Sequence, residues 1–318
     1  GKSFRSKSNS ELIRWGEQSC SVHAAVQDQH TEFELGLIIE NNLRRGLING
    51  QKAKSISSYL GRLACVTFSP SDLEIIKGGP AERRSFIDRH IIELDPQMIE
   101  HYVNFNRALR SKSKILGEPY VTPDMLRSWN KILSDTGVRI YLARIGFLQE
   151  ITKEANRLHA EFAKEDGTLE LSLISSVATA AQRGSEALLE FYEEHARNEI
   201  YQRRCLYGPQ RDEIEIKFNA IDSRAFASQG QSRSLVLSLK LAVIQELERV
   251  RGESPVILLD DVDAELDAAR GQAFFRMILN ESRQVFITAT DAHVVELCKL
   301  GKPHLMEVVG GRLSEASI

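Results

Sequence analysis

The chain has 318 residues, of which 27% are charged and 42% hydrophobic, a composition typical of globular protein and long enough for two domains. Its net charge of −3 excludes binding of nucleic acid through overall charge, so any such site must be a local patch. No apolar run approaches the ~20 residues of a membrane-spanning helix, and four scattered cysteines without a Cys-x-x-Cys pair favour a reducing cytoplasm over a disulfide framework or a zinc site.

The first 95 residues combine short strand-like runs with turns. Three such runs predict strands, at residues 20–27, 32–39 and 63–68. Between the second and third, Asn49-Gly50 is the strongest short signal for a β-hairpin. After the third strand, Gly78-Gly79-Pro80 leads into a helix that we expect to begin near Ala81.

From Pro96 to about Arg204 glycines become rare and helical periodicity dominates. We interpret this region as an inserted all-helical arm, with a possible strand at residues 169–174. Its clearest apolar seam steps by three and four residues, through Leu148, Ile151, Ala155, Leu158 and Phe162. Such a seam is more often one side of a packed antiparallel pair than a zipper for a partner protein.

From Tyr207 onward strands and helices alternate. Residues 213–218 alternate charged and apolar side chains, which predicts a half-buried strand, and residues 235–250 predict a buried helix. Buried strands are expected at 256–259 and 285–288, and a last strand pair around Gly310-Gly311. This alternation predicts a parallel sheet with helices on its faces.

A polar turn, Ser228-Gln229-Gly230-Gln231, opens the long apolar helix. The amino end of a helix presents backbone N–H groups and a positive dipole to an anion. Gly230 would allow a phosphate to approach the backbone, and Ser228 would add a hydroxyl donor. In isolation the same residues would serve as an ordinary helix cap. Arg233, one turn further on, either contacts phosphate or extends along the surface.

Asp260 and Asp261 follow the strand expected at 256–259. Adjacent carboxylates repel each other unless a cation is near, and a parallel sheet delivers Mg²⁺ ligands to a phosphate in this way. We interpret Asp260 as a ligand of Mg²⁺ through water and Asp261 as the general base for the attacking water. The alternative is a pair of solvated acids or a helix cap.

Two further positions belong to the predicted nucleotide site. Asp267 ends the loop that follows the acid pair and is well placed to cap the next helix. Such a loop could also lie between two subunits and couple their sites, and the two roles are compatible. Thr290 follows the strand expected at 285–288, where we expect a γ-phosphate sensor, and it is better placed than His293.

Local groups of basic residues are candidates for contact with a DNA backbone, although each alone is more often a solvated face. They are Lys2, Arg5 and Lys7; Lys77, Arg83 and Arg84; and Arg107, Arg110, Lys112 and Lys114. Arg211, in the turn Tyr207–Asp212, is a further candidate for a phosphate or DNA contact. A surface ion pair between Arg211 and Asp212 would also explain that turn.

A P-loop of the pattern Gly-x-x-x-x-Gly-Lys-Ser/Thr is missing from the sequence. Gly1-Lys2-Ser3 is rejected because residues 4–10 are too polar and serine-rich to form the buried helix that must follow. The chain as written is therefore expected to hold the distal half of a nucleotide site and to lack hydrolytic activity by itself.

Together these residues resemble the RecF family, bacterial DNA-repair ATPases whose head is like that of SMC proteins. The resemblance covers essentially the whole chain. It rests on Gly1–Arg5, Phe68–Leu73, Gly78–Arg84, Tyr207–Asp212, Ser228–Leu235, Leu258–Val262 and Glu265–Asp267. In this family Gly-Lys-Ser-Phe-Arg lies downstream of the P-loop, so several tens of residues are expected to precede Gly1. Gln210 departs from the family, which commonly has His there.

The resemblance implies an α/β ABC/SMC-like ATPase head, with a sheet of the P-loop NTPase type, and an inserted helical arm. We expect head segments at 1–95 and 205–318 and the arm at 96–204. By resemblance, Ser228, Gly230 and Gln231 form the signature turn, Asp260 and Asp261 the Walker B pair, and Ala264–Asp267 the D-loop.

The resemblance also implies ATP and Mg²⁺ as cofactors, an ATP-dependent homodimer on DNA, slow hydrolysis, and cooperation with RecO and RecR to load RecA at gaps. Because the P-loop is missing, a second hypothesis is a non-catalytic module that binds DNA or RecR. A third, another SMC-like head, is disfavoured because such heads carry a far longer coiled-coil arm.

Overall fold

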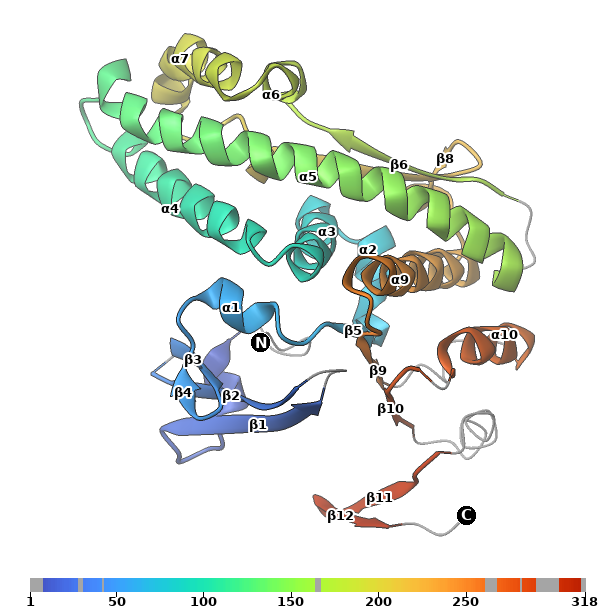
Figure 1. The fold of residues 1–318 in the computed structure, drawn as a ribbon. Helices are drawn as coiled ribbons and strands as arrows, with labels where there is room; N and C mark the ends of the chain where they lie inside the picture. Colours follow the sequence, from blue (N-terminus) through green and yellow to red (C-terminus); the bar gives the residue numbers. More distant parts are fainter. Residues whose placement is uncertain are drawn as a thin grey trace.

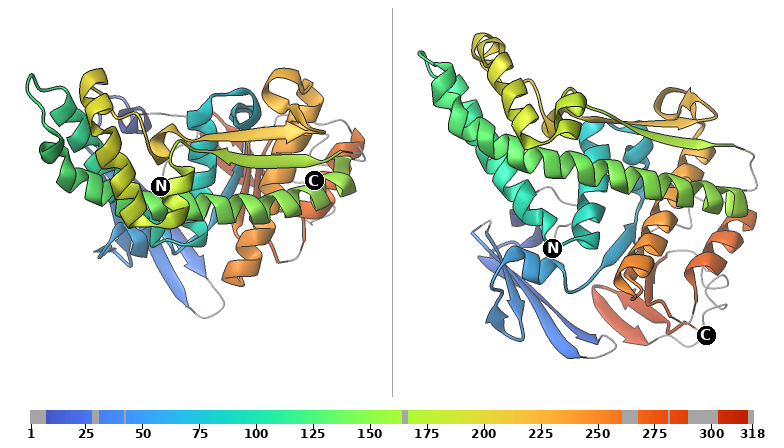
Figure 2. Two further views of the ribbon diagram at one scale, coloured as in Figure 1. Left: turned by 90° about the horizontal axis from the view of Figure 1, so that it is seen from above. Right: turned by 45° about the horizontal axis from the view of Figure 1, so that its top comes forward.

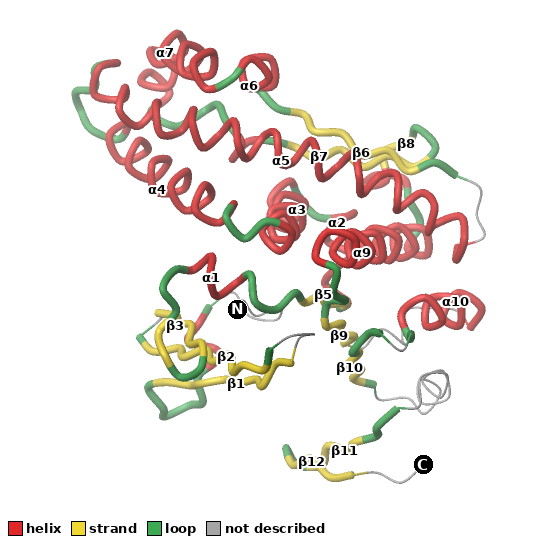
Figure 3. Tube along the Cα trace, in the orientation of Figure 1, coloured by secondary structure: helices red, strands yellow, loops and turns green. Residues whose placement is uncertain are grey.

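The computed structural model describes residues 8–27, 31–41, 43–163, 167–260, 268–280, 282–289 and 303–315. Helices gather on one side of the molecule, where α5 runs across its whole width, and most strands lie on the other side (Figures 1 and 3). The views of Figure 2 show the same long helix crossing above the head, with the first antiparallel sheet below it.

The first antiparallel sheet is formed, in this order, by β1 (Ser19–Gln27), β2 (Glu32–Glu40), β3 (Leu43–Ile48) and β4 (Gln51–Lys52). Asn49 and Gly50 join the last two strands with positive φ angles of 50° and 73°. Two positive φ angles define a type I′ hairpin, which Asn-Gly favours, so the predicted hairpin is confirmed. The short elements η1 (Asn9–Leu12) and α1 (Ile56–Leu60) flank this sheet.

A parallel sheet lies at the centre of the head, as predicted. Its described strands have the order β10–β9–β5, and they are β5 (Cys65–Phe68), β9 (Val256–Asp260) and β10 (Val285–Thr288). Ile257 and Leu259 of the middle strand are buried. The expectation that 256–259 is fully buried holds only for alternate residues, and the expectation that 285–288 is a buried strand is wrong. Phe286 exposes 54% of its surface, because the described elements leave that side of β10 uncovered.

Helices follow β5 in an almost unbroken series. They are η2 (Pro70–Leu73), α2 (Glu74–Lys77), α3 (Pro80–Leu94), α4 (Met98–Leu116), α5 (Pro123–Ala163), α6 (Ala178–Arg183) and α7 (Ser185–Gln202). The 41 residues of α5 pack against α4 and α7, and further along against α9 (Gln229–Arg251).

The apolar seam predicted on α5 is buried at Leu148, Ile151, Ala155 and Leu158, and this half of the helix contacts α9. Arg157 Nη2 donates to Gln245 Oε1 at 2.8 Å, and His159 Nδ1 lies 2.9 Å from Ser238 Oγ. Heptad-like spacing indicates that a helix has a helical partner, but not which one. The second half of α5 therefore contacts a helix that is distant in the chain and lies outside residues 96–204.

A second antiparallel sheet joins the arm region to the segment that follows it. It contains β6 (Leu169–Ile174), β7 (Glu213–Phe218) and β8 (Ile221–Asp222), in that order. Leu169 pairs with Phe218 and Ile174 with Glu213. The division of the chain at residues 95 and 204 stays a prediction.

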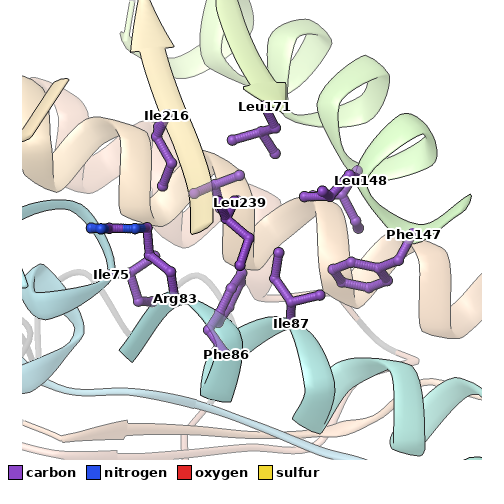
Figure 4. Close-up of a pocket in the computed structure, with 11 residues that line it drawn as sticks. Ile75, Arg83, Phe86, Ile87, Phe147, Leu148, Leu171, Ile216 and Leu239 are labelled. Carbon is purple, nitrogen blue, oxygen red and sulfur yellow. The ribbon is translucent and has the colours of Figure 1, made fainter. Parts of the chain in front are cut away.

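A small apolar pocket lies where α2, α3, α5 and α9 meet β6 and β7 (Figure 4). Ile87, Leu148 and Leu239 are among its lining side chains, and Arg83 contributes the one charged group of the lining. With so few polar groups, the pocket is a gap in core packing rather than a site for a polar ligand.

The described chain ends in α10 (Ala268–Ile278), β10 and a hairpin of β11 (Met306–Val309) and β12 (Arg312–Glu315). Gly310 and Gly311, both with positive φ, form the hairpin turn that the sequence predicts. Among the residues described, no helix has the length and apolar character needed to cross a membrane.

Candidate nucleotide-binding site and basic surfaces

The predicted anion-binding turn lies at the amino end of α9. Ser228 Oγ accepts the N–H of Gln231 at 3.1 Å, and Gln231 Oε1 accepts the N–H of Ser228 at 3.0 Å. This reciprocal capping box satisfies two backbone donors and fixes the shape of the turn. Ser228 is exposed, and its hydroxyl proton can still be donated to an incoming acceptor. The helix-cap alternative thus describes the turn in this structure, and it is compatible with anion binding.

Arg270 of α10 brings a positive charge to this turn. A Cβ built on Gly230 would lie 3.6 Å from Arg270 Nη1, and the same nitrogen donates to Ser234 Oγ at 3.3 Å. A guanidinium beside a helix amino terminus adds to the positive potential there. Sequence reasoning did not select Arg270, because only the packing of α10 beside α9 brings it to the turn.

Asp260 is the last residue of β9, the middle strand of the parallel sheet. Thr288, the last residue of β10, lies beside it in register, and Thr288 Oγ1 donates to Asp260 Oδ1 at 2.6 Å. The carboxyl ends of parallel strands meet at one edge of a sheet, which is where ligands bind in such folds. Sequence reasoning missed Thr288; its position at the end of the neighbouring strand is the signal that could have found it.

Lys240 joins α9 to the segment that follows β5. Its ammonium donates to the Thr67 carbonyl and forms an ion pair with Asp72. Burial lowers the pKa of Lys240, an effect that the Asp72 carboxylate opposes. Because β5 pairs with β9, this contact attaches the helix behind Ser228 to the sheet that ends in Asp260.

Several predicted site residues lie outside the described residues. They are Asp261, Asp267 and Thr290 of the nucleotide site, together with the basic residues Lys2, Arg5 and Lys7.

Arg83 points into the protein, with 4% of its surface exposed. Its guanidinium donates to both carboxylate oxygens of Glu213, at 2.8 and 3.0 Å, and to the Gly78 carbonyl at 2.9 Å. The predicted DNA contact of Arg83 is therefore wrong, because all three nitrogens are used inside the fold. Arg84 is half-buried and donates to the Asp212 carbonyl at 2.6 Å, and its DNA contact stays a prediction.

The basic residues of α4 divide between the interior and the surface. Lys112 is 1% exposed, and its Nζ lies 2.5 Å from Glu199 Oε2 of α7. Its predicted DNA contact is wrong, because the ammonium neutralises a buried carboxylate. Arg107, Arg110 and Lys114 are exposed and share one side of the helix, since they are spaced by three and four residues.

Arg211 lies in η3 (Pro209–Arg211) and is exposed, although Nε and Nη2 donate to the Cys205 carbonyl at 3.3 and 3.1 Å. The alternative of a surface ion pair with Asp212 is wrong, because the Asp212 carboxylate is buried against Arg144 at 2.8 Å. The DNA contact of Arg211 stays a prediction.

Two exposed arginines, Arg203 and Arg204, extend the basic surface of α4 at the carboxyl end of α7. Ser113 Oγ lies 3.3 Å from Cys205 Sγ, so the segment that carries these arginines is held beside α4. Both are visible in the sequence as a basic pair, but only the contacts of Cys205 and Glu199 with α4 show that this pair follows a segment held against that helix.

Three features define the class of this protein as an ATPase head of the ABC/SMC type. They are a parallel sheet with an acid at its carboxyl edge, a helix opened by a Ser-Gln-Gly-Gln turn, and an inserted helical arm. Comparison with curated proteins narrows this class. The DNA replication and repair protein RecF of Limosilactobacillus reuteri (strain DSM 20016) is 31% identical over 325 residues, which cover 100% of this chain and 87% of that protein. The chain belongs to the RecF family.

Other relatives and solved structures agree. RecF of Myxococcus xanthus (strain DK1622) is 31% identical over 323 residues, covering 98% of this chain and 84% of that protein. Solved structures of the recombination mediator protein RecF in the RecFOR pathway, as RecF-ATPrS and RecF-ATP, match with TM-scores of 0.87 and 0.86. Their identities are 28% and 26%, and each comparison covers 99% of this chain and 85% of the other. No protein-family model matches the chain. The predicted fold class is confirmed.

Proposed function

We propose that this protein is an ATP-dependent DNA-binding protein of recombinational gap repair, in which two copies close around ATP on DNA. The observation that carries the proposal is the combination of the capped Ser228 turn with Asp260 at the carboxyl edge of a parallel sheet. Relatives named as DNA replication and repair proteins support the repair role. RecF structures described with ATP and ATPrS in the RecFOR pathway support the nucleotide and a place in that pathway. Cooperation with RecO and RecR to load RecA is part of the proposal.

The donor set at the sheet edge fits a magnesium–nucleotide site. Carboxylate and hydroxyl oxygens are the ligands that Mg²⁺ prefers, and Asp260 and Thr288 offer both types side by side. A bound Mg²⁺–ATP would supply the transferable phosphoryl group and the cation that neutralises its charge. Asp260 would hold the cation through water, Asp261 would accept a proton from the attacking water, and Thr288 keeps the Asp260 carboxylate oriented.

In a closed pair, the Ser228 turn of one copy would face the ATP held by the other. The Ser228 hydroxyl would donate to the γ-phosphate, and Gly230 would let the backbone approach it. The capping box with Gln231 fixes the turn before the phosphate arrives, which lowers the entropic cost of closure. Asp267 at the seam and Thr290 as phosphate sensor complete the proposed site.

The DNA surface that we favour lies along α4. Arg107, Arg110 and Lys114 are exposed on one side of that helix, and Arg203 and Arg204 lie beside its carboxyl end. Positive side chains that contact only the phosphate backbone bind DNA without distinguishing its base sequence. The affinity of this surface should therefore fall steeply as the salt concentration rises.

Asp261→Asn in the full-length protein should leave ATP binding intact and lower hydrolysis by about 100-fold or more, because the general base is lost. The ATP-bound dimer should then accumulate, which sedimentation velocity with and without ATP will show. Ser228→Arg is the matched control: it should bind ATP as a monomer and fail to dimerise. Turnover that survives Asp261→Asn would refute the assignment of the base. A wild-type protein that never dimerises with ATP would refute the proposed function.

A further inference from the structure

Lys77 contacts the segment that leads into the Ser228 turn. It is the last residue of α2, and its side chain reaches the one-turn helix α8 (Ser223–Phe226). Lys77 Nζ donates to the carbonyl oxygens of Ser223 at 3.3 Å, Arg224 at 3.2 Å and Ala227 at 2.5 Å. An ammonium has three N–H donors, so this single side chain can use all of them on the three carbonyls of residues 223, 224 and 227.

This contact compensates for the shortness of α8. A helix of four residues is unstable alone, and its last carbonyls have no partner within the helix. Asp222 caps the amino end, where its Oδ1 accepts the N–H of Arg224 at 2.9 Å. Lys77 supplies the carboxyl end with donors and with the positive charge that the helix dipole favours there.

The contact also reaches the first peptide group of the Ser228 turn. The carbonyl of Ala227 and the N–H of Ser228 belong to one planar peptide unit. Lys77 holds its oxygen at 2.5 Å, while Gln231 Oε1 accepts its N–H at 3.0 Å. Because the peptide unit is rigid, Lys77 fixes the orientation of the peptide group from which the Ser228 residue and its capping box extend.

The base from which Lys77 extends is itself fixed. Ile75 and Ile76 of the same helix are buried, and the Gly78 carbonyl accepts a hydrogen bond from Arg83 at 2.9 Å. A Cβ on Gly78 would lie 2.4 Å from the Glu74 carbonyl oxygen, so this close return of the chain requires glycine. Through β5, which pairs with β9, the same segment is connected to the strand that ends in Asp260.

From this geometry we propose that Lys77 is a positioning residue for the Ser228 turn. It orients the turn that closes over the ATP of a second copy, and it does not touch the nucleotide of its own copy. The inference rests on the proposed function. The sequence groups Lys77 with Arg83 and Arg84 as a basic surface cluster, whereas the structure directs its ammonium to three backbone carbonyls.

Lys77→Met in the full-length protein should separate ATP binding from ATP-dependent dimerisation. We expect ATP affinity of the monomer within two-fold of wild type, ATP-dependent dimerisation weakened at least ten-fold, and faster hydrogen exchange at residues 228–231. Lys77→Arg, which keeps the charge and the donors, should recover most of the dimerisation. Lys153→Met, at an exposed position of α5, is the matched control and should change none of the three.

Wild-type dimerisation and exchange in Lys77→Met would overturn the proposal. So would equal losses of ATP affinity, dimerisation and thermal stability, since these would show a general structural role. Failure of the proposed function has a different result, namely no ATP-dependent dimer of the wild-type protein. Hydrogen exchange at residues 228–231 would still decide in that case whether Lys77 orders the turn.

Mixed dimers give a second test, because the turn acts on the other copy. Lys77→Met and Asp260→Asn are each expected to be inactive alone. In a mixed dimer, one ATP site combines the altered Asp260 of one copy with the altered turn of the other. The second ATP site has neither change, so hydrolysis should reappear. A mixture of Lys77→Met with Ser228→Arg damages both sites and should stay inactive. Recovery in the first mixture alone supports the proposal, and recovery in both or in neither contradicts it.

Discussion

Arg144→Met is expected to lower the free energy of unfolding by about 3–5 kcal/mol, because it leaves a buried carboxylate without its cation. Arg144 is 3% exposed. It donates to both oxygens of Asp88 at 2.8 Å, to the Pro209 carbonyl at 2.7 Å and to Asp212 Oδ2 at 2.8 Å. The Asp212 side chain is 0% exposed, so water cannot replace the lost partner.

The measurement is equilibrium unfolding in denaturant, and the control is Arg127→Met. Arg127 contacts Glu193 at 3.1 Å, but the two side chains are 69% and 40% exposed. An exposed pair of this kind contributes about 0–1 kcal/mol. Similar losses in the two variants would contradict the role assigned to the buried Arg144.

The effect of Arg144→Met should also depend on pH. Burial raises the pKa of Asp212 above its ordinary 3.8, and Arg144 limits that rise. An acid with a raised pKa in the folded protein contributes stability that is present below the unfolded pKa and is lost as pH rises through the folded pKa. Without Arg144 the folded pKa rises further, so the loss of stability should be largest at neutral pH and shrink toward a pH of about 4. Asp212→Asn in the same background should remove the part of this dependence that comes from Asp212.

The Arg144 contacts also explain the turn Tyr207–Asp212 by packing. Gly208 has a φ of 120°, and a Cβ there would lie 2.6 Å from Gln210 Oε1 and 2.7 Å from Tyr192 Oη. The turn thus needs glycine for both conformation and space. Asp212 then points into the interior and pairs with Arg144 of α5. Because Arg144 also pairs with Asp88 of α3, this one arginine connects the turn, α5 and α3.

Much of the fold could be predicted because local periodicity carries it. Strands β6, β7 and β10 begin and end at the predicted residues, since their alternation or apolar runs are bounded by turn residues. The Ser228 turn and Asp260 could be found for a similar reason. Each is a polar residue with specific chemistry at the clearly marked end of a helix or strand.

The direction of charged side chains could not be predicted, because it depends on partners that are distant in the chain. Arg83 meets Glu213, and Lys112 meets Glu199. Within a run of basic residues on one helix, the sequence does not distinguish the side chain that faces such a partner from its exposed neighbours. For the same reason the sequence groups Lys77 with surface residues, although its acceptors lie at 223–227.

Lys112→Met and Lys114→Met are expected to separate folding from DNA binding, although the two lysines are two residues apart on α4. Lys112 Nζ lies 2.5 Å from Glu199 Oε2 and 4.9 Å from the centre of the Tyr192 ring. Glu199 is 0% exposed, so Lys112→Met should lower the free energy of unfolding by about 3–5 kcal/mol. Lys114→Met, at an exposed position, should change it by about 0.5 kcal/mol or less. Lys112→Met/Glu199→Leu should regain part of the loss, because no buried charge then lacks a partner.

DNA affinity should respond in the opposite order. Each lysine that reaches a phosphate releases counterions, so Lys114→Met should reduce the slope of log affinity against log salt by about 0.9, and Lys112→Met should leave that slope unchanged. The measurement is a salt titration of DNA binding at a temperature where both variants are folded. A charge that already neutralises a buried carboxylate has no counterions to release. An equal reduction of the slope in Lys112→Met would therefore place that ammonium on DNA and contradict the buried pair with Glu199.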